Sequence, residues 1–190
     1  DNDCQYCNSN CVRGIGGRMS KLQVETISHT NNTTALTIDS SGRVSLPLVP
    51  AFRVSLTSDQ SITATGDHTI EWNEGTTSES DNSFTQGGFS WSSGVVTVPV
   101  AGVYSFSIIL RADAVGSGYF VGKLLKNNDG SGNREAYIID GSPPSNYTNI
   151  TGTTVFKCAA NDNIRVTIGS SADSSYSLTN HSNFSGHLIG

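Results

Sequence analysis

Three cysteines close to the N-terminus have a spacing that could bind a metal. Cys4, Cys7 and Cys11 form the pattern Cys-x2-Cys-x3-Cys, which offers three thiolates to a zinc ion. A closed structural zinc site needs four ligands, and no other Cys or His lies near these three in the sequence. Three interpretations stay open: a metal site completed by folding, a disulfide or inter-subunit bridge, and an unstructured tail. We expect no cofactor.

The remaining nucleophiles and bases do not form a recognisable catalytic motif. The four histidines lie far apart, and no Gly-x-Ser-x-Gly elbow accompanies the many serines. No spacing of Asp and Glu selects a carboxylate pair for glycoside hydrolysis. Cys158 lies in an apolar run, where a cysteine is most often a small buried hydrophobic residue. We therefore expect no catalytic residue and no enzyme activity.

An acidic segment around Trp72 is the first candidate for ligand contact. Its carboxylates, Asp67 and Glu74 among them, are numerous enough for a calcium ion, but their spacing matches no defined calcium loop. A solvated loop is the simpler interpretation, and binding residues often lie on such loops. Asp67, Trp72 and Glu74, with Asp129 from a Gly- and Asn-rich segment, are therefore the candidate ligand-binding residues. Trp72 has an alternative interpretation as part of the core.

The composition favours strands joined by short loops. The chain has 190 residues, of which 35% are hydrophobic and 14% charged, and 20 are glycine. The net charge of −5 comes without a run of Lys or Arg that could neutralise phosphates, so we expect no nucleic-acid partner. No stretch approaches the roughly 18 consecutive apolar residues of a membrane span, so we expect no membrane insertion.

The pattern along the chain divides it into three parts. Residues 1–18 hold almost no aliphatic residue and are expected to be a flexible, cysteine-containing tail. Residues 19–49 contain two alternating apolar patches with a turn signal at 39–42, and predict a short β-rich attachment or stalk segment. Because so small a β segment buries little surface, it needs a partner from other subunits or another protein. Residues 50–190 form the head.

The head has the pattern of an antiparallel sandwich. Short apolar runs bounded by Gly, Pro, Asn, Asp and Ser predict about eight or nine strands. Within residues 103–110, one face is apolar and the other semi-polar: Tyr104, Phe106, Ile108 and Leu110 share the first, and Val103, Ser105, Ser107 and Ile109 share the second. No segment has a sustained helical period. The sequence therefore predicts an all-β protein built from two antiparallel sheets.

Several strings of the head resemble one family in their order along the chain. The string 94–107 resembles the strand, Pro-x-x-Gly turn and aromatic strand of the globular head of complement C1q. Three further strings resemble later strands of that head: 124–127, 155–164 and 183–189. Asn161 stands where the family usually has Gly, and because Asn tolerates a positive φ, the turn can be kept.

This resemblance implies a jelly-roll fold, shared with the tumour necrosis factors, and assembly as a homotrimer. It implies that the trimer forms around apolar and aromatic residues, and Tyr104, Phe106 and Phe184 are the candidates for trimer contacts or core. Members of the family are not enzymes, and they bind through variable loops, so no binding residue is carried over.

The N-terminal strings 22–29 and 33–44 resemble a different group of proteins, the virion structural proteins of tailed phages, especially of marine and cyanobacterial hosts. This resemblance implies a virion structural protein: a trimeric head, fibre-like appendage or capsid decoration that attaches to other virion proteins through its N-terminal segment. Its exposed loops would stabilise the particle or bind a host-surface glycan or protein. The alternative is a secreted, extracellular C1q-like recognition domain that binds glycan or protein ligands.

Overall fold

The structure is a computed structural model that describes residues 24–63, 65–72, 83–113, 120–127, 134–139, 147–170 and 175–190, the segment 134–139 by its backbone alone. The chain divides into two compact units, Asp1–Ser45 and Leu46–Gly190, which we call the small unit and the head. All regular elements in the described part of the chain are strands. No helix in this part is long and apolar enough to cross a membrane.

The small unit contains a three-stranded antiparallel meander. Its strands, in spatial order, are β1 (Thr26–Ser28), β2 (Thr34–Ile38) and β3 (Val44–Ser45). The turn between β2 and β3 is built by Asp39, which accepts hydrogen bonds from the backbone N–H groups of Ser41 and Arg43 and pairs with the Arg43 guanidinium at 2.7 Å. Gly42 takes a positive φ of 78° in this turn. The turn signal at 39–42 thus corresponds to a tight turn between two short strands.

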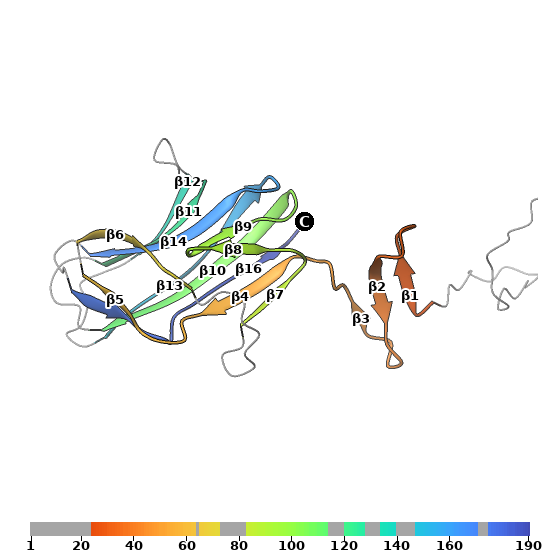
Figure 1. Cartoon of the computed structure of the whole chain (residues 1–190), viewed down its shortest axis with the longest axis horizontal. Coiled ribbons are helices and arrows are strands. Elements are labelled where there is room, and N and C mark those ends of the chain that lie inside the picture. Colours follow the sequence, from red (N-terminus) through yellow and green to blue (C-terminus); the bar gives the residue numbers. More distant parts are fainter. Residues whose placement is uncertain are drawn as a thin grey trace, which may run out of the picture. The chain divides into compact units, whose positions relative to one another are not determined.

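The head consists of two antiparallel sheets that stack face to face (Figure 1). The front sheet has seven strands: β4 (Ala51–Ser55), β5 (Gln60–Ile62), β7 (Phe84–Gln86), β10 (Gly102–Asp113), β13 (Tyr147–Cys158), β15 (Tyr176–Leu178) and β16 (Asn183–Leu188). The back sheet has six strands: β6 (Gly66–Thr69), β8 (Ser90–Ser92), β9 (Val95–Thr97), β11 (Phe120–Lys126), β12 (Arg134–Ile139) and β14 (Asn163–Ser170).

The core between the sheets is rich in aromatic side chains. Tyr104, Phe106, Ile108 and Leu110 of β10 all point inward and are fully buried, as the alternation predicts. Phe52 contacts three other rings edge-on, with centroid distances of 4.7 Å to Phe89 and 4.9 Å to both Trp91 and Phe184. Such edge-to-face pairs add to the stabilisation that burial alone provides.

One glycine shows how closely the core is packed. At Gly186 of β16, a Cβ atom would lie 2.6 Å from the Phe106 ring and 2.7 Å from the Phe52 ring. Any side chain there would have to displace both rings, so the absence of a side chain at this position lets the aromatic cluster form.

The predicted all-β class and two-sheet sandwich are confirmed. The described part of the head has more strands than the eight or nine expected, because several are only three or four residues long. The additional strands are Gln60–Ile62, Gly66–Thr69, Phe84–Gln86 and Tyr176–Leu178. Each is too short to show an apolar run in the sequence, and pairing with a neighbouring strand makes it part of a sheet.

We predict that Phe52→Ala destabilises the head by about 3–5 kcal/mol, because it removes a fully buried ring and leaves a cavity among its neighbours. Phe84→Ala is the matched control, since Phe84 is 44% exposed and its loss should change stability by about 0.5 kcal/mol or less. Urea unfolding followed by tryptophan fluorescence measures both. Equal destabilisation by the two substitutions would contradict this description of the core.

Candidate interaction surface

The sequence-predicted ligand residues do not come together in one exposed site. Trp72 is only 3% exposed, and its ring centroid lies 6.0 Å from that of Phe184. The interpretation of Trp72 as an exposed loop residue is therefore corrected, because its large apolar ring is buried in the core despite its acidic neighbours in the sequence. Its buried position matches the alternative interpretation, in which Trp72 is part of the core.

Asp67 lies on the back sheet, where it makes an ion pair. Its carboxylate is 2.6 Å from the Lys123 ammonium, linking β6 to β11. Glu74, Asp129 and the three N-terminal cysteines, Cys4, Cys7 and Cys11, lie outside the described residues. Within the described ranges, no group of three or more His, Cys, Asp or Glu residues is placed to hold a metal ion.

The outward side of the front sheet is the candidate interaction surface. Strand β10 pairs with β13 over its whole length, from Gly102 opposite Cys158 to Asp113 opposite Tyr147, with no break in register. Since every second residue of β10 faces the core, the intervening residues of both strands face outward. We call this set the front face: Val103, Ser105, Ser107, Ile109, Arg111, Asp113, Tyr147, Asn149, Thr151, Thr153, Val155 and Lys157.

The middle of the front face carries no charge. The outward-facing residues of 105–109 and 151–155 are all Ser, Thr, Ile or Val. Val155 is 54% exposed and Ile109 is 44% exposed. An uncharged centre is typical of surfaces that become buried against a partner, because charged residues are depleted there.

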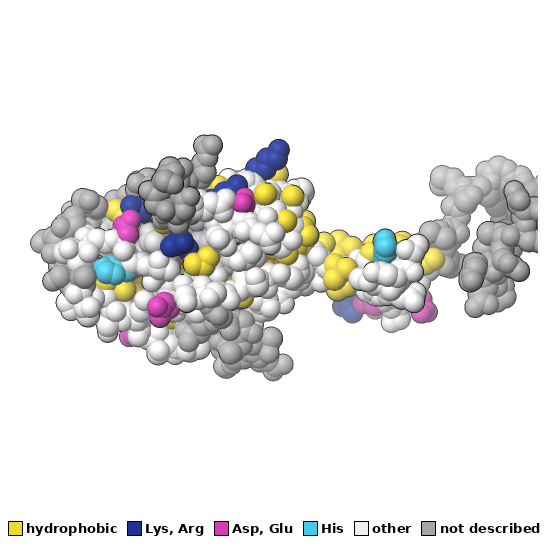
Figure 2. Space-filling view, turned by 45° about the horizontal axis from the view of Figure 1, so that its top comes forward, with side chains coloured by type: hydrophobic (Ala, Val, Ile, Leu, Met, Phe, Trp, Pro, Cys, Tyr) yellow, Lys and Arg dark blue, Asp and Glu magenta, His cyan; other side chains and the backbone are white. Residues whose placement is uncertain are grey.

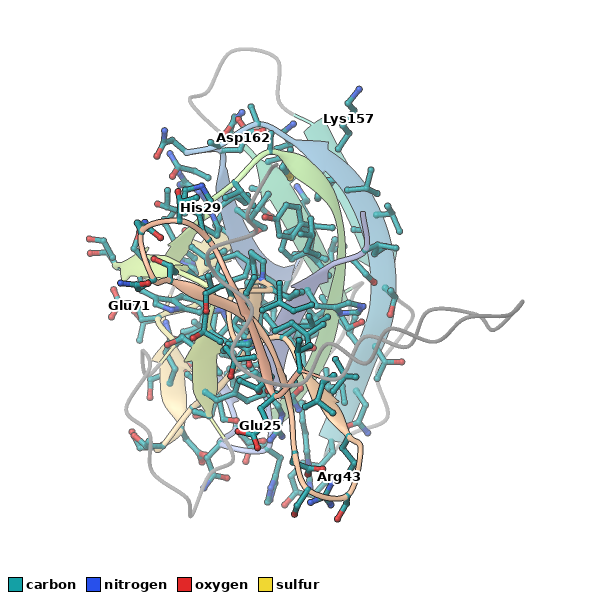
Figure 3. The ribbon with its side chains drawn as sticks, turned by 90° about the vertical axis from the view of Figure 1, so that its right-hand side faces the viewer. Glu25, His29, Arg43, Glu71, Lys157 and Asp162 are labelled. Carbon is teal, nitrogen blue, oxygen red and sulfur yellow. The ribbon has the colours of Figure 1, made fainter. Side chains whose placement is uncertain are left out.

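Charged residues of the front face lie at its two ends. Lys157 lies at the end of β13 that adjoins the β13–β14 turn, as does Asp162 in that turn (Figure 3). At the other end, the Arg111 guanidinium lies 4.1 Å from the centroid of the Tyr147 ring, a cation–π contact. The charges therefore surround the apolar and hydroxyl centre instead of interrupting it.

Two facing hydroxyl groups satisfy each other at the centre. The oxygen atoms Ser107 Oγ and Thr153 Oγ1 are 2.7 Å apart across the β10–β13 pair. A polar group that loses water costs free energy unless it keeps a hydrogen bond. Because this pair already has one, the surface can be covered by a partner at little cost.

The β13–β14 turn is held by a network of largely buried polar groups. Asp162 accepts hydrogen bonds from the Asn127 side-chain amide at 2.7 Å and from the Ala159 N–H at 2.8 Å, and pairs with Lys126 at 2.8 Å. Burial acts to raise the pKa of Asp162, but the hydrogen bonds from Lys126, Asn127 and Ala159 outweigh it and hold the pKa below its ordinary value of 3.8. Asn161, in the same turn, takes a positive φ of 70°. Asn therefore adopts the backbone conformation for which Gly is usual at this position, and the turn is kept.

Cys158 ends β13 beside this network and points into the core. Burial raises the pKa of its thiol to about 11, with smaller opposing effects of Lys126, which lowers it, and Asp162, which raises it. The thiol is therefore protonated near neutral pH, and since the thiolate is the reactive form, Cys158 is a structural residue.

Comparison with known proteins identifies the head. The sequence model of the C1q domain matches residues 51–189, nearly the whole head. The chain belongs to the C1q domain family. Its similarity to the globular domain of zebrafish complement 1qA has a TM-score of 0.52 at 18% identity, and covers 74% of this chain and 98% of that one. Murine APRIL has a TM-score of 0.54 at 16% identity, with the same coverage. The curated proteins with which the chain was compared include no match.

Membership of the C1q family confirms two expectations from the sequence. C1q and tumour necrosis factor domains form a jelly roll, and they are not enzymes. They typically form homotrimers. Tyr104, Phe106 and Phe184, the candidates for trimer contacts or core, all lie inside the core of one chain. Residues such as Thr153 and Val155 were missed as site candidates, although every second residue from Asn149 to Val155 is Thr, Asn or Val, which indicates a strand with an exposed face.

We predict that Asp162→Asn destabilises the head by about 1–3 kcal/mol at pH 7, because Lys126 loses its charged partner. The pKa of Asp162 is lowered in the folded state, so its carboxylate stabilises the fold above about pH 3.8 and this contribution is lost as pH falls through the folded-state pKa. The difference in free energy of unfolding between the variant and the natural protein should therefore become smaller at acidic pH.

The matched control is Asp67→Asn, which removes the carboxylate of a more exposed ion pair and should cost about 1 kcal/mol or less. Urea unfolding at about pH 7 and about pH 3 measures both variants. If Asp162→Asn lowered the free energy of unfolding equally at both pH values, the stabilising role of the Asp162 carboxylate would be contradicted.

Proposed function

We propose that this chain is a non-enzymatic binding module that works as a homotrimer, with the front face of each protomer buried against its neighbours. The exposed surface that remains recognises a protein or glycan outside the cell. The observation that carries the proposal is the uncharged centre of the front face, with Val155 and Ile109 exposed in the single chain. Exposed apolar side chains that cluster on one surface mark interaction sites.

The edge position of β13 supports the same proposal. Among the described strands, β13 pairs only with β10, so its other side leaves a row of backbone N–H and C=O groups unpaired with any described strand. A twelve-residue edge strand is open to pairing with other chains unless it is covered. A neighbouring protomer in a closed trimer covers both this edge and the adjoining front face, and a closed ring leaves no further copy to add.

Trimeric assembly also suits recognition through weak contacts. Three copies of any exposed binding surface can engage a repetitive ligand together, and the combined affinity then exceeds that of one copy by orders of magnitude. Glycans and oligomeric proteins are ligands of this repetitive kind. A glycan array and a cell-surface binding assay with the full chain would identify the class, and binding lost on conversion to monomers would support the multivalent mode.

A second candidate function is a virion structural role, supported by the strings at 22–29 and 33–44 and by the presence of a separate small unit before the head. In this role the small unit attaches to other virion proteins. Mass spectrometry of purified virus particles tests it, since the chain must then be a component of the particle. Glycosylated asparagine in the native protein would favour the extracellular recognition role instead.

We predict that Val155→Asp converts the trimer to monomers, because a carboxylate placed at the uncharged centre of the front face would be buried without a partner. Val100→Asp is the control: Val100 is a similarly exposed valine that lies outside the front face, and this variant should stay trimeric. Sedimentation velocity measures the mass, and circular dichroism checks that both variants fold. A trimer in both variants would exclude the front face as the interface.

A further inference from the structure

The small unit has one aliphatic face. The register pairs Ile27 with Leu36 and Ile38 with Val44, and Leu36 and Ile38 lie two residues apart on β2, so all four side chains point to the same side of the sheet. On the opposite side, Thr37 pairs with Thr26 of β1 and with Ser45 of β3. The sheet is thus amphipathic, with one aliphatic face and one hydroxyl face.

The described residues leave the aliphatic face uncovered. Ile27 is 46% exposed and Val44 is 58% exposed, and hydrophobic side chains are visible on the surface of this unit in Figure 2. Three strands of five residues or fewer cannot form a stable core unless another surface packs against them. Something must therefore cover this face when the protein is folded.

The charged side chains within residues 24–45 lie at the ends of the strands. Figure 3 shows His29 near the β1–β2 turn and Arg43 at the β2–β3 turn, and Arg43 is paired with Asp39. Glu25 lies at a bend before β1, at the same end as Arg43. The aliphatic face itself consists of Ile27, Leu36, Ile38 and Val44, so copies of it can pack together without burying a charge between them.

The segment that joins β3 to β4 is short and is bonded to β7. Only residues 46–50 separate β3 from β4. The Gln86 side-chain amide donates hydrogen bonds to the Leu46 carbonyl at 3.0 Å and to the Val49 carbonyl at 2.9 Å, so this segment is fixed to β7. Gly87 permits the approach, since a Cβ atom there would lie 2.6 Å from Pro50. The small unit is therefore joined to its own head by a short tether.

We infer that the β1–β2–β3 sheets of three protomers pack their aliphatic faces together around the threefold axis and form a trimeric β stalk. The inference rests on the proposed homotrimer, which holds three identical sheets on one particle. Short tethers of this kind give effective concentrations of about 1 mM, so a face too small to associate by itself becomes occupied by its own copies. In a closed trimer, each sheet has the same surroundings, and none of the three aliphatic faces is left over.

Photocrosslinking of the full chain tests this inference. The crosslinking residue p-benzoylphenylalanine replaces Val44 on the aliphatic face or, as the matched control, Ser45 on the hydroxyl face. Illumination of the Val44 variant should give covalent dimers and trimers whose crosslinks map to residues 26–45 of another copy. The Ser45 variant should give few. Equal yields from both positions, or crosslinks only within one chain, would overturn the inference.

Amide hydrogen exchange provides a second test that does not depend on the bulky crosslinker. Ile27→Asp should raise the exchange rates of amides in β1, β2 and β3 by ~10-fold or more, and Thr26→Asp, its neighbour on the hydroxyl face, should leave them nearly unchanged. Amides of the head report whether it stays folded. Similar exchange rates in both variants would overturn the inference.

Light scattering on the same samples separates the two proposals. A monomeric natural protein would overturn the homotrimer and the stalk together. A trimer in which the amides of residues 26–45 exchange as fast as those of an unfolded peptide would overturn the stalk alone, and the aliphatic face would then serve to bind a different protein.

Discussion

The unbroken pairing of β10 with β13 determines which side chains of the head face its core and which face outward. A slip of one residue between these strands would turn Phe106 and Leu110 outward and bring Ser107 inward. The buried aromatic cluster prevents such a slip, because Phe52, Phe89 and Phe184 fit around the rings of β10 only in this register. The core therefore fixes the composition of the front face.

The front face and the aliphatic face of the small unit are uncovered for the same reason. A sheet has two sides, and a single core covers only one of them. The front sheet buries one side against the back sheet, and the other side has an uncharged centre along β10 and β13. The small unit has no second layer among its described residues, so its aliphatic side has no cover. The proposed homotrimer would cover both surfaces with further copies of the chain.

Most of the head could be predicted from the sequence, because its long strands carry apolar residues at alternate positions. The alternation from Tyr104 to Leu110 indicates a strand with one buried face, and the strings 94–107 and 155–164 indicate the C1q family. Four short strands could not be predicted, since three or four residues are too few to form a recognisable alternating pattern. Trp72 was misplaced because local composition records its acidic neighbours but not the distant Phe184 against which it packs. The phage resemblance of the N-terminal strings stays a prediction.

The candidate surface was harder to predict than the fold. Ligand residues were sought among loop carboxylates, whereas the features that characterise the front face are the absence of charge and the small size of its hydroxyl residues. Such a surface has no local motif, and it becomes apparent only when the register places Ser107 opposite Thr153. Multi-angle light scattering of the natural full chain tests the central claim most directly. A mass three times the 20.0 kDa of one chain is predicted, and the mass of a single chain at every concentration would contradict the account.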